Sequence, residues 1–368
     1  MFGKIYRKIA NIPGWKTKRK IVVIETDDWG SIMMPSNDVY NKLIKAGLNL
    51  GQGNESVYNK YDSLANALDL EALYEVLCSV KDKNNNFAKF TAMSLVANPD
   101  FEKIKANHFE SYHYELFTET LARYNRSDAF ELWKEGIDKG VFYPEFHGRE
   151  HLNVQYWLRE LQNDDKNSVL AFDNGMWGFN RGEGKLGYQA AFDLDKSSDV
   201  VEQHIIIEDG LQLFEKLHGY KARFFVPPNG PINNQLEETA AKYGIEYMSS
   251  PKLQKEALGG GKTKTHFRYV GKKNKYNQIY ITRNVFFEPT PFENQVNSAL
   301  KDIELAFNFN KPAVISSHRV NYIGVLHEEN RTNSLKELKA LLSTIIKKWP
   351  DVEFMTSTEL GDVIRSSK

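Results

Sequence analysis

The chain has 368 residues and carries 48 basic and 48 acidic side chains, so its formal net charge is zero. This length suits one barrel-sized domain with insertions or two ordinary domains, and the balanced charge argues against a nucleic-acid-binding protein. The single cysteine excludes an internal disulfide framework and a zinc cluster built from cysteines.

Residues 1–20 form a basic arm with seven lysine or arginine residues before the first acidic residue of the chain. Neither the arm nor any later segment has the pattern of a secretory signal or a transmembrane helix, so we expect a cytoplasmic protein. Two interpretations of the arm stay open. It is a solvated leader into the first strand, or an amphipathic segment that makes peripheral contact with an anionic membrane through Phe2, Ile5, Tyr6 and Ile9.

Strand-like and helix-like segments alternate along residues 21–368, which we interpret as a single domain. Apolar and β-branched runs predict strands at 21–26, 89–95, 141–146, 221–226, 245–248, 279–286, 312–317 and 352–355. Periodic apolar residues with end signals predict helices at 70–80 after Asp69, at 234–243, and at 335–349 after Ser334. This alternation predicts an α/β fold with a largely parallel sheet or barrel.

Two stretches are predicted to be insertions, at about 36–85 and 255–280. The first is rich in Asn, Gly, Tyr and Lys before its helix, and the second contains three consecutive glycines and many lysines. In the second, the strand-like segments 267–270 and 278–281 flank a Lys/Asn-rich turn, which predicts a β-hairpin flap. Loops carried on a rigid barrel commonly form the walls of a substrate cleft.

Polar side chains follow the first and third predicted strands. Asp27 and Asp28 end the first strand, and His147 and His151 follow the third. Adjacent carboxylates repel each other and are costly to bury without a partner, and a divalent metal is the simplest partner. One carboxylate with two imidazoles leaves coordination positions open for water and substrate. The alternative without a metal is a turn or helix cap at the aspartates and two exposed loop histidines.

The order of these motifs resembles that of the NodB-homology polysaccharide deacetylases of carbohydrate esterase family 4. The family's Thr-Phe-Asp-Asp corresponds to ETDD at 25–28, and its His-Ser/Thr-x-x-His to HGREH at 147–151. Its Arg-Pro-Pro-Tyr-Gly corresponds to VPPNG at 226–230, and its late histidine to His318 after an apolar strand. The resemblance covers roughly residues 20–360 without the insertions. It implies a distorted (β/α)7-type barrel with helical and β-hairpin insertions.

The resemblance also implies a metal centre. Asp28, His147 and His151 would hold one divalent ion, for which zinc is expected and cobalt, nickel and manganese are alternatives. Asp27 would be the catalytic base that accepts a proton from the attacking water. A metal in this position lowers the pKa of water and polarises a carbonyl oxygen.

Three further residues complete the expected site. His318 would protonate the departing amine, and the backbone N–H of Asn229 would bind the oxyanion. Trp177, in a glycine-flanked loop, has two interpretations that stay open: a core residue, or a residue that stacks on a sugar ring.

Two parts of the family pattern are missing. The arginine that orients the base is Val226 in this chain. Arg149, between the two histidines, is our first candidate to replace it as a catalytic-site residue, and Arg223 is the second. The fourth motif, whose aspartate tunes a catalytic side chain, has no match near residues 247–250.

The expected function is metal-dependent hydrolysis of an acetyl group from an N-acetylated or O-acetylated sugar of a polysaccharide or its precursor. The expected partner is therefore a carbohydrate substrate and not a nucleic acid. One alternative is another hydrolase of the same barrel superfamily, acting on a glycosidic or another amide bond; a glycosidase would use paired carboxylates. The other is a non-catalytic carbohydrate-binding relative, which the missing motifs favour and the Asp/His/His set opposes.

Overall fold

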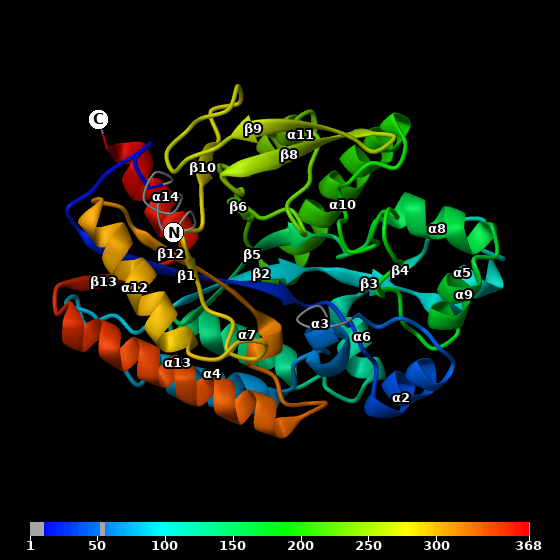
Figure 1. Cartoon of the computed structure of the whole chain (residues 1–368), viewed down its shortest axis with the longest axis horizontal. Helices are drawn as coiled ribbons and strands as arrows, with labels where there is room; N and C mark the ends of the chain where they lie inside the picture. Colours follow the sequence, from blue (N-terminus) through cyan, green and yellow to red (C-terminus); the bar gives the residue numbers. More distant parts are fainter. Residues whose placement is uncertain (1–10, 52–55, 368) are drawn as a thin grey trace.

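The computed structural model describes residues 11–51 and 56–367, and its centre is a curled, parallel β-sheet (Figure 1). The predicted α/β fold class is confirmed. The strand order is β10-β7-β6-β5-β2-β1-β12-β11, and β13 also pairs with β1. These strands are β1 (Lys20–Trp29), β2 (Phe90–Leu95), β5 (Phe142–Gly148), β6 (Phe224–Phe225), β7 (Tyr247–Ser249), β10 (Ile279–Ile281), β11 (Val285–Phe286), β12 (Ala313–His318) and β13 (Val352–Met355).

The segment 279–286, predicted as one strand, is two short strands with different partners. β10 pairs with β7, whereas β11 pairs with β12. The change of partner occurs at Asn284, which bonds to Val314 of β12. Its backbone N–H donates to the Val314 carbonyl at 3.1 Å, and its side-chain oxygen accepts from the Val314 N–H at 2.8 Å. Because β10 and β11 are the two ends of the strand order, residues 282–284 connect the edges of the sheet. The result is the distorted barrel that the sequence predicts.

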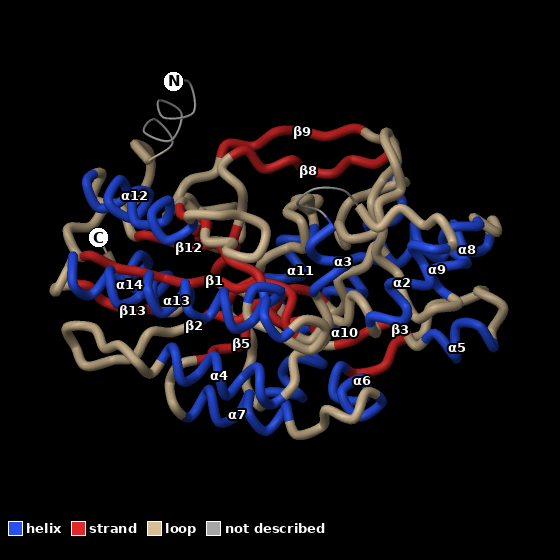
Figure 2. The backbone as a smooth tube through the Cα atoms, turned by 60° about the horizontal axis from the view of Figure 1, so that its bottom comes forward, coloured by secondary structure: helices blue, strands red, loops and turns tan. Residues whose placement is uncertain are grey.

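Helices cover the outside of this sheet (Figures 1 and 2). α4, α7 and α13 pack beside one another against the sheet, and α10 and α11 pack together further along it. None of the helices in the described part of the chain is long and apolar enough to span a membrane. The helices are α2 (Asn37–Lys45), α3 (Ser56–Tyr61), α4 (Ala67–Leu77), α5 (Phe101–Ala106), α6 (Phe117–Arg123), α7 (Ala129–Asp138), α8 (Val154–Gln162), α9 (Lys166–Phe172), α10 (Val200–His218), α11 (Leu236–Lys242), α12 (Gln295–Asn308), α13 (Glu328–Lys348) and α14 (Ser357–Ser366), with two 3₁₀ turns, η2 (Ser197–Asp199) and η3 (Arg319–Asn321).

Two predicted helix starts need correction. α4 begins at Ala67, because Asn66 is its N-cap and forms a capping box with Asp69, whose carboxylate accepts the Asn66 N–H at 3.1 Å. α13 begins at Glu328, so Ser334 lies inside that helix. Its first two turns carry no large apolar residue, so the capping-box pattern of Ser334 with Glu337 and the apolar periodicity together placed its start too late.

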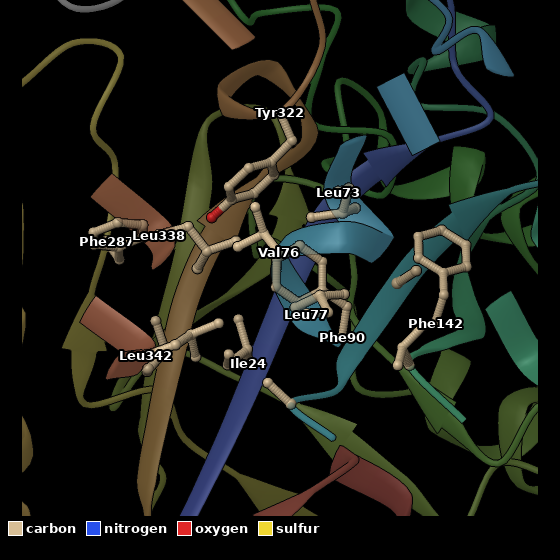
Figure 3. Close-up of a cluster of buried hydrophobic side chains, with 14 of the residues drawn as sticks. Ile24, Leu73, Val76, Leu77, Phe90, Phe142, Phe287, Tyr322, Leu338 and Leu342 are labelled. Atoms are coloured by element: carbon tan, nitrogen blue, oxygen red, sulfur yellow. The ribbon is translucent and has the colours of Figure 1, made fainter. Parts of the chain in front are cut away.

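The alternation of side chains along β1 separates two cores. Val22 and Ile24 face the covering helices, where they join Phe90 and the leucines of α4 and α13 (Figure 3). Ile21 and Val23 face the barrel interior with other apolar residues. The next interior positions of the same strand are acidic, so the apolar filling gives way to a polar end. Barrels of this kind carry their sites at this C-terminal end of the strands.

Two small antiparallel sheets lie outside the barrel. β3 (Ala97–Pro99) pairs with β4 (Tyr114–Leu116), and β8 (Leu253–Gly259) pairs with β9 (Lys262–Phe267). The second is a β-hairpin, but the predicted pairing of 267–270 with 278–281 is wrong. Gly260 and Gly261 form its turn with φ angles of 60° and 71°, a conformation that suits glycine and a tight hairpin connection.

Candidate metal centre and active site

A β-bulge places both aspartates of β1 in the same pocket. Successive side chains of a regular strand point to opposite faces. The register of β1 against β2 shifts between Thr26 and Trp29, and Asp28 has a φ of 78°. The Trp29 indole N–H donates to the Thr26 hydroxyl at 2.8 Å across this bulge. As a result, Asp27 and Asp28 line one pocket together, which a regular strand would prevent.

A second irregularity presents the first histidine. The register of β5 against β2 shifts at His147, next to Gly148, which has a φ of 142°. The Nδ1 atom of His147 hydrogen-bonds to the Val226 carbonyl at 2.6 Å. This bond makes Nδ1 the protonated nitrogen and leaves Nε2 as a ligand atom. The Nε2 atom is buried and has no hydrogen-bond partner among the described residues.

Asp28, His147 and His151 come together as the sequence predicts, and all three are buried. The Asp28 Oδ1 atom lies 3.4 Å from His147 Nε2 and 3.2 Å from His151 Nε2. Zinc ligands about 2.0–2.1 Å from the ion in tetrahedral geometry lie about 3.3–3.4 Å apart, so these separations suit a shared metal. Burial opposes ionisation of Asp28, but the two histidines hold its pKa well below the usual value. The donor set of one carboxylate and two imidazoles therefore fits a divalent transition metal.

Arg283 holds Asp27, in the role that the sequence assigned to Arg149. Its two terminal nitrogens donate to the two oxygens of Asp27, each at 2.6 Å, and its Nε donates to Glu25 at 2.6 Å. Burial opposes ionisation of Asp27, but the guanidinium outweighs it and keeps the pKa of this carboxyl below its usual value. Arg283 lies between β10 and β11, where the broken strand turns toward β1.

The prediction that Arg149 orients Asp27 is wrong. Its Nε and one terminal nitrogen bind Glu150 at 2.7 and 3.0 Å, and the other terminal nitrogen binds Asp209 at 3.0 Å. The guanidinium also lies over the ring of Tyr114, 4.5 Å from its centroid. These contacts hold in place the loop that carries His147 and His151. The second candidate, Arg223, binds Glu246 and Asp362 at the surface instead.

His318 lies at the end of β12 and faces the base. Its Nδ1 hydrogen-bonds to Glu288 at 2.6 Å, and its Nε2 lies 3.7 Å from Asp27 Oδ2. Burial lowers the pKa of His318, but the charges of Glu288, Asp28 and Asp27 outweigh it and raise this pKa to about 10. Glu288 is itself held by the side-chain amide of Asn321 at 2.6 Å. His318 is thus paired with a carboxylate, although the chain lacks the fourth motif.

The sequence analysis did not identify Tyr58, which α3 brings into the same pocket. Its ring meets that of His318 edge to face, with centroids 5.4 Å apart. Burial and the surrounding carboxylates raise the pKa of Tyr58, so its hydroxyl keeps its proton. The position of α3 is fixed because Asp62, one residue beyond it, accepts two hydrogen bonds from the fully buried Arg319, at 3.0 and 2.8 Å.

The pocket has a volume of about 600 Å³ and includes the metal-ligand set, Asp27, Arg283 and His318. Asn229 also lines it, in a turn closed by a hydrogen bond from the Gly230 N–H to the Pro227 carbonyl at 3.0 Å. Asn229 therefore shares the pocket with Asp27 and His318.

Trp177 belongs to the core. It is 1% exposed, and its indole N–H donates to the Ile32 carbonyl at 3.0 Å. Its ring stacks beside that of His151 at 28° and 6.2 Å between centroids. Of the two sequence interpretations, the sugar-stacking one is wrong, and Trp177 instead packs beside His151.

No protein-family model matches the sequence, and no curated protein matches it either. The structure is similar to a putative polysaccharide deacetylase from Mycobacterium smegmatis, with 11% identity, a TM-score of 0.44, and coverage of 96% of this chain and 93% of the other. It is similar to a 4-alpha-glucanotransferase from Thermococcus litoralis, with 12% identity, a TM-score of 0.45, and coverage of 93% and 40%. It is also similar to a carbohydrate esterase family 4 pseudoenzyme from Bacillus anthracis, with 13% identity, a TM-score of 0.37, and coverage of 94% and 66%.

Proposed function

We propose that this protein is a metal-dependent hydrolase that removes an acetyl group from an acetylated sugar. One observation carries the proposal. A buried Asp28–His147–His151 set, a carboxylate fixed by an arginine, and a carboxylate-bound histidine all line one pocket. These are a metal site, a base and an acid, which are the three components that hydrolysis of an amide with water requires.

Each residue of the site has its own chemical role. Asp28, His147 and His151 would hold a divalent metal, which would lower the pKa of water and polarise the carbonyl oxygen. Asp27 accepts a proton from the water as its oxygen bonds to the acyl carbon. The fixed Arg283 contact keeps Asp27 ionised and in one orientation, as a general base requires.

His318 acts on the opposite side of the acyl carbon. Its Nδ1 is engaged by Glu288, so its Nε2 proton is the one available to the pocket. Protonation of the leaving nitrogen by Nε2 accompanies cleavage of the C–N bond, and the products are acetate and the free amine. The Asn229 N–H is our candidate donor to the oxyanion, and the Tyr58 hydroxyl is a second group that faces the reacting atoms.

The geometry favours this function over a glycosidase and over a non-catalytic relative. A glycosidase needs a protonated carboxylic acid, whereas Asp27 is bound by Arg283 and Glu288 is bound to His318. The non-catalytic alternative relied on the missing arginine and fourth motif. Arg283 and Glu288 fill both of these positions, which removes the reason for that alternative.

Acetate release from a tetramer of N-acetylglucosamine and from acetylated xylan tests the proposal. The protein loaded with zinc or cobalt is expected to release acetate, with one free amine per acetate from the amino sugar, and the chelated protein is not. His318→Ala should keep its metal and lose far more activity on the amide than on p-nitrophenyl acetate, whose leaving group needs no proton. New reducing ends without acetate, or no acetate from either glycan with metal bound, would contradict the proposal.

A further inference from the structure

Four large exposed apolar side chains belong to the catalytic pocket or to segments next to its lining. Phe286 lines the pocket and is 58% exposed. Ile12 and Leu253 each follow a pocket-lining residue in the sequence, and they are 53% and 52% exposed. Phe267 is 47% exposed and pairs directly with Leu253 across the β8–β9 hairpin. Single exposed apolar residues are ordinary, but a group of them at one opening indicates a binding surface.

The same region concentrates positive charge in a chain whose net charge is zero. Residues 251–276 carry seven lysines and Arg268 against one acidic residue, Glu256. Arg268 and Glu256 are buried, and Glu256 binds His266, so the exposed charged residues of this segment are all lysines. The exposed lysines are Lys255, Lys262, Lys264, Lys273 and Lys275.

The β8–β9 hairpin presents both kinds of residue, apolar and basic, on an outward face. Its register places Leu253, Lys255, Thr265 and Phe267 together on one side, because Leu253 opposes Phe267 and Lys255 opposes Thr265. The residues between them turn inward, where Gln254 accepts a hydrogen bond from Arg268. Both views of the backbone place the hairpin at the periphery of the molecule (Figures 1 and 2).

We propose that this surface, made of Ile12, Leu253, Phe267, Phe286 and the hairpin lysines Lys255 and Lys262, binds an anionic phospholipid membrane. Apolar side chains enter the boundary between headgroups and acyl chains, while surrounding lysines are attracted to the anionic headgroups. The aliphatic residues Ile12 and Leu253 favour a membrane over an acidic glycan or a nucleic acid, since those ligands are bound through charge and through stacking on aromatic rings, which only Phe267 and Phe286 could supply.

Membrane binding would turn the mouth of the pocket toward the bilayer. Given the proposed function, on which this step rests, the substrate is then an acetylated glycan carried on a membrane lipid. The membrane contact itself needs neither turnover nor a metal, so it can be tested separately.

Co-sedimentation with vesicles tests the proposal. The protein is expected to bind vesicles of phosphatidylcholine with 30% phosphatidylglycerol at least tenfold more tightly than pure phosphatidylcholine, and binding should weaken as salt rises. The apolar variant carries Leu253→Ser with Phe267→Ser. Its matched control carries Leu68→Ser with Val201→Ser, which are 63% and 65% exposed on α4 and α10. The apolar variant should lose at least tenfold in affinity, and the control should bind as the wild type does.

A second pair of variants tests the lysines by reversing their charge. Lys255→Glu with Lys262→Glu should lose at least tenfold in affinity for the anionic vesicles. Lys336→Glu with Lys339→Glu, at exposed positions of α13, makes the same change in net charge and should have a much smaller effect. Equal losses in variants and controls, or wild-type binding by both hairpin variants, would overturn the proposal. Binding to heparin without binding to vesicles would assign the lysines to an acidic glycan instead.

Discussion

Replacement of Arg283 by methionine is expected to destabilise the fold by about 3–5 kcal/mol and to abolish turnover, because it leaves two buried carboxylates without their shared cation. Arg283 binds Asp27 through both terminal nitrogens and Glu25 through Nε, and Glu25 is fully buried. Denaturant unfolding and acetate release measure the two effects.

Arg223→Met is the matched control for this variant. Arg223 also binds two carboxylates, Glu246 and Asp362, but its side chain is 37% exposed. A surface arrangement of this kind contributes about 0–1 kcal/mol, so this variant should unfold and turn over almost as the wild type does. Stability and turnover of Arg283→Met equal to those of the Arg223→Met control would show that Arg283 does not hold the base.

Asp27→Asn should keep its metal and lose a factor of about 10²–10⁴ in turnover, since an amide cannot take the proton from water. The neighbouring change, Asp28→Asn, should instead lose most of its metal, because Asp28 is one of only three protein ligands in the described site. Metal analysis and acetate release on both variants separate the two roles. Metal loss in Asp27→Asn with retention in Asp28→Asn would reverse the assignments.

The sequence located the metal-ligand set because its residues directly follow predicted strands. Parallel strands bring their C-terminal ends to one end of a barrel, so Asp28 and His147 are expected on the same side of the molecule. The same reasoning placed His318 at the end of its strand, beside the first aspartate. The irregularities of β1 and β5 that turn Asp28 and His147 into one pocket were not visible in the spacing.

Arg283 and Glu288 could not be found in the same way. The segment 279–286 has the pattern of one continuous strand, in which Arg283 is an interior position with no special direction. The strand breaks there because its two halves pair with different strands, and this pairing is set by the tertiary fold. The polar centre of this segment at 282–284, with Arg283 in its middle and Glu288 two residues beyond its end, was the available signal.

Arg149 is the opposite case, a residue that was predicted to hold Asp27 and does not contact it. Its position between two ligand residues suggested that it would reach Asp27. The adjacent Glu150 and the more distant Asp209 take its guanidinium instead. Proximity in sequence places a backbone, but it does not determine where a long side chain points.

The central claim is that one divalent metal binds at Asp28, His147 and His151. Crystals of the protein soaked in zinc, with data collected at the zinc absorption edge, test it most directly. We expect one anomalous peak about 2.0–2.2 Å from a carboxylate oxygen of Asp28 and from an imidazole nitrogen of each histidine. Absence of a peak at these three residues, or a fully occupied zinc site elsewhere with none here, would contradict it.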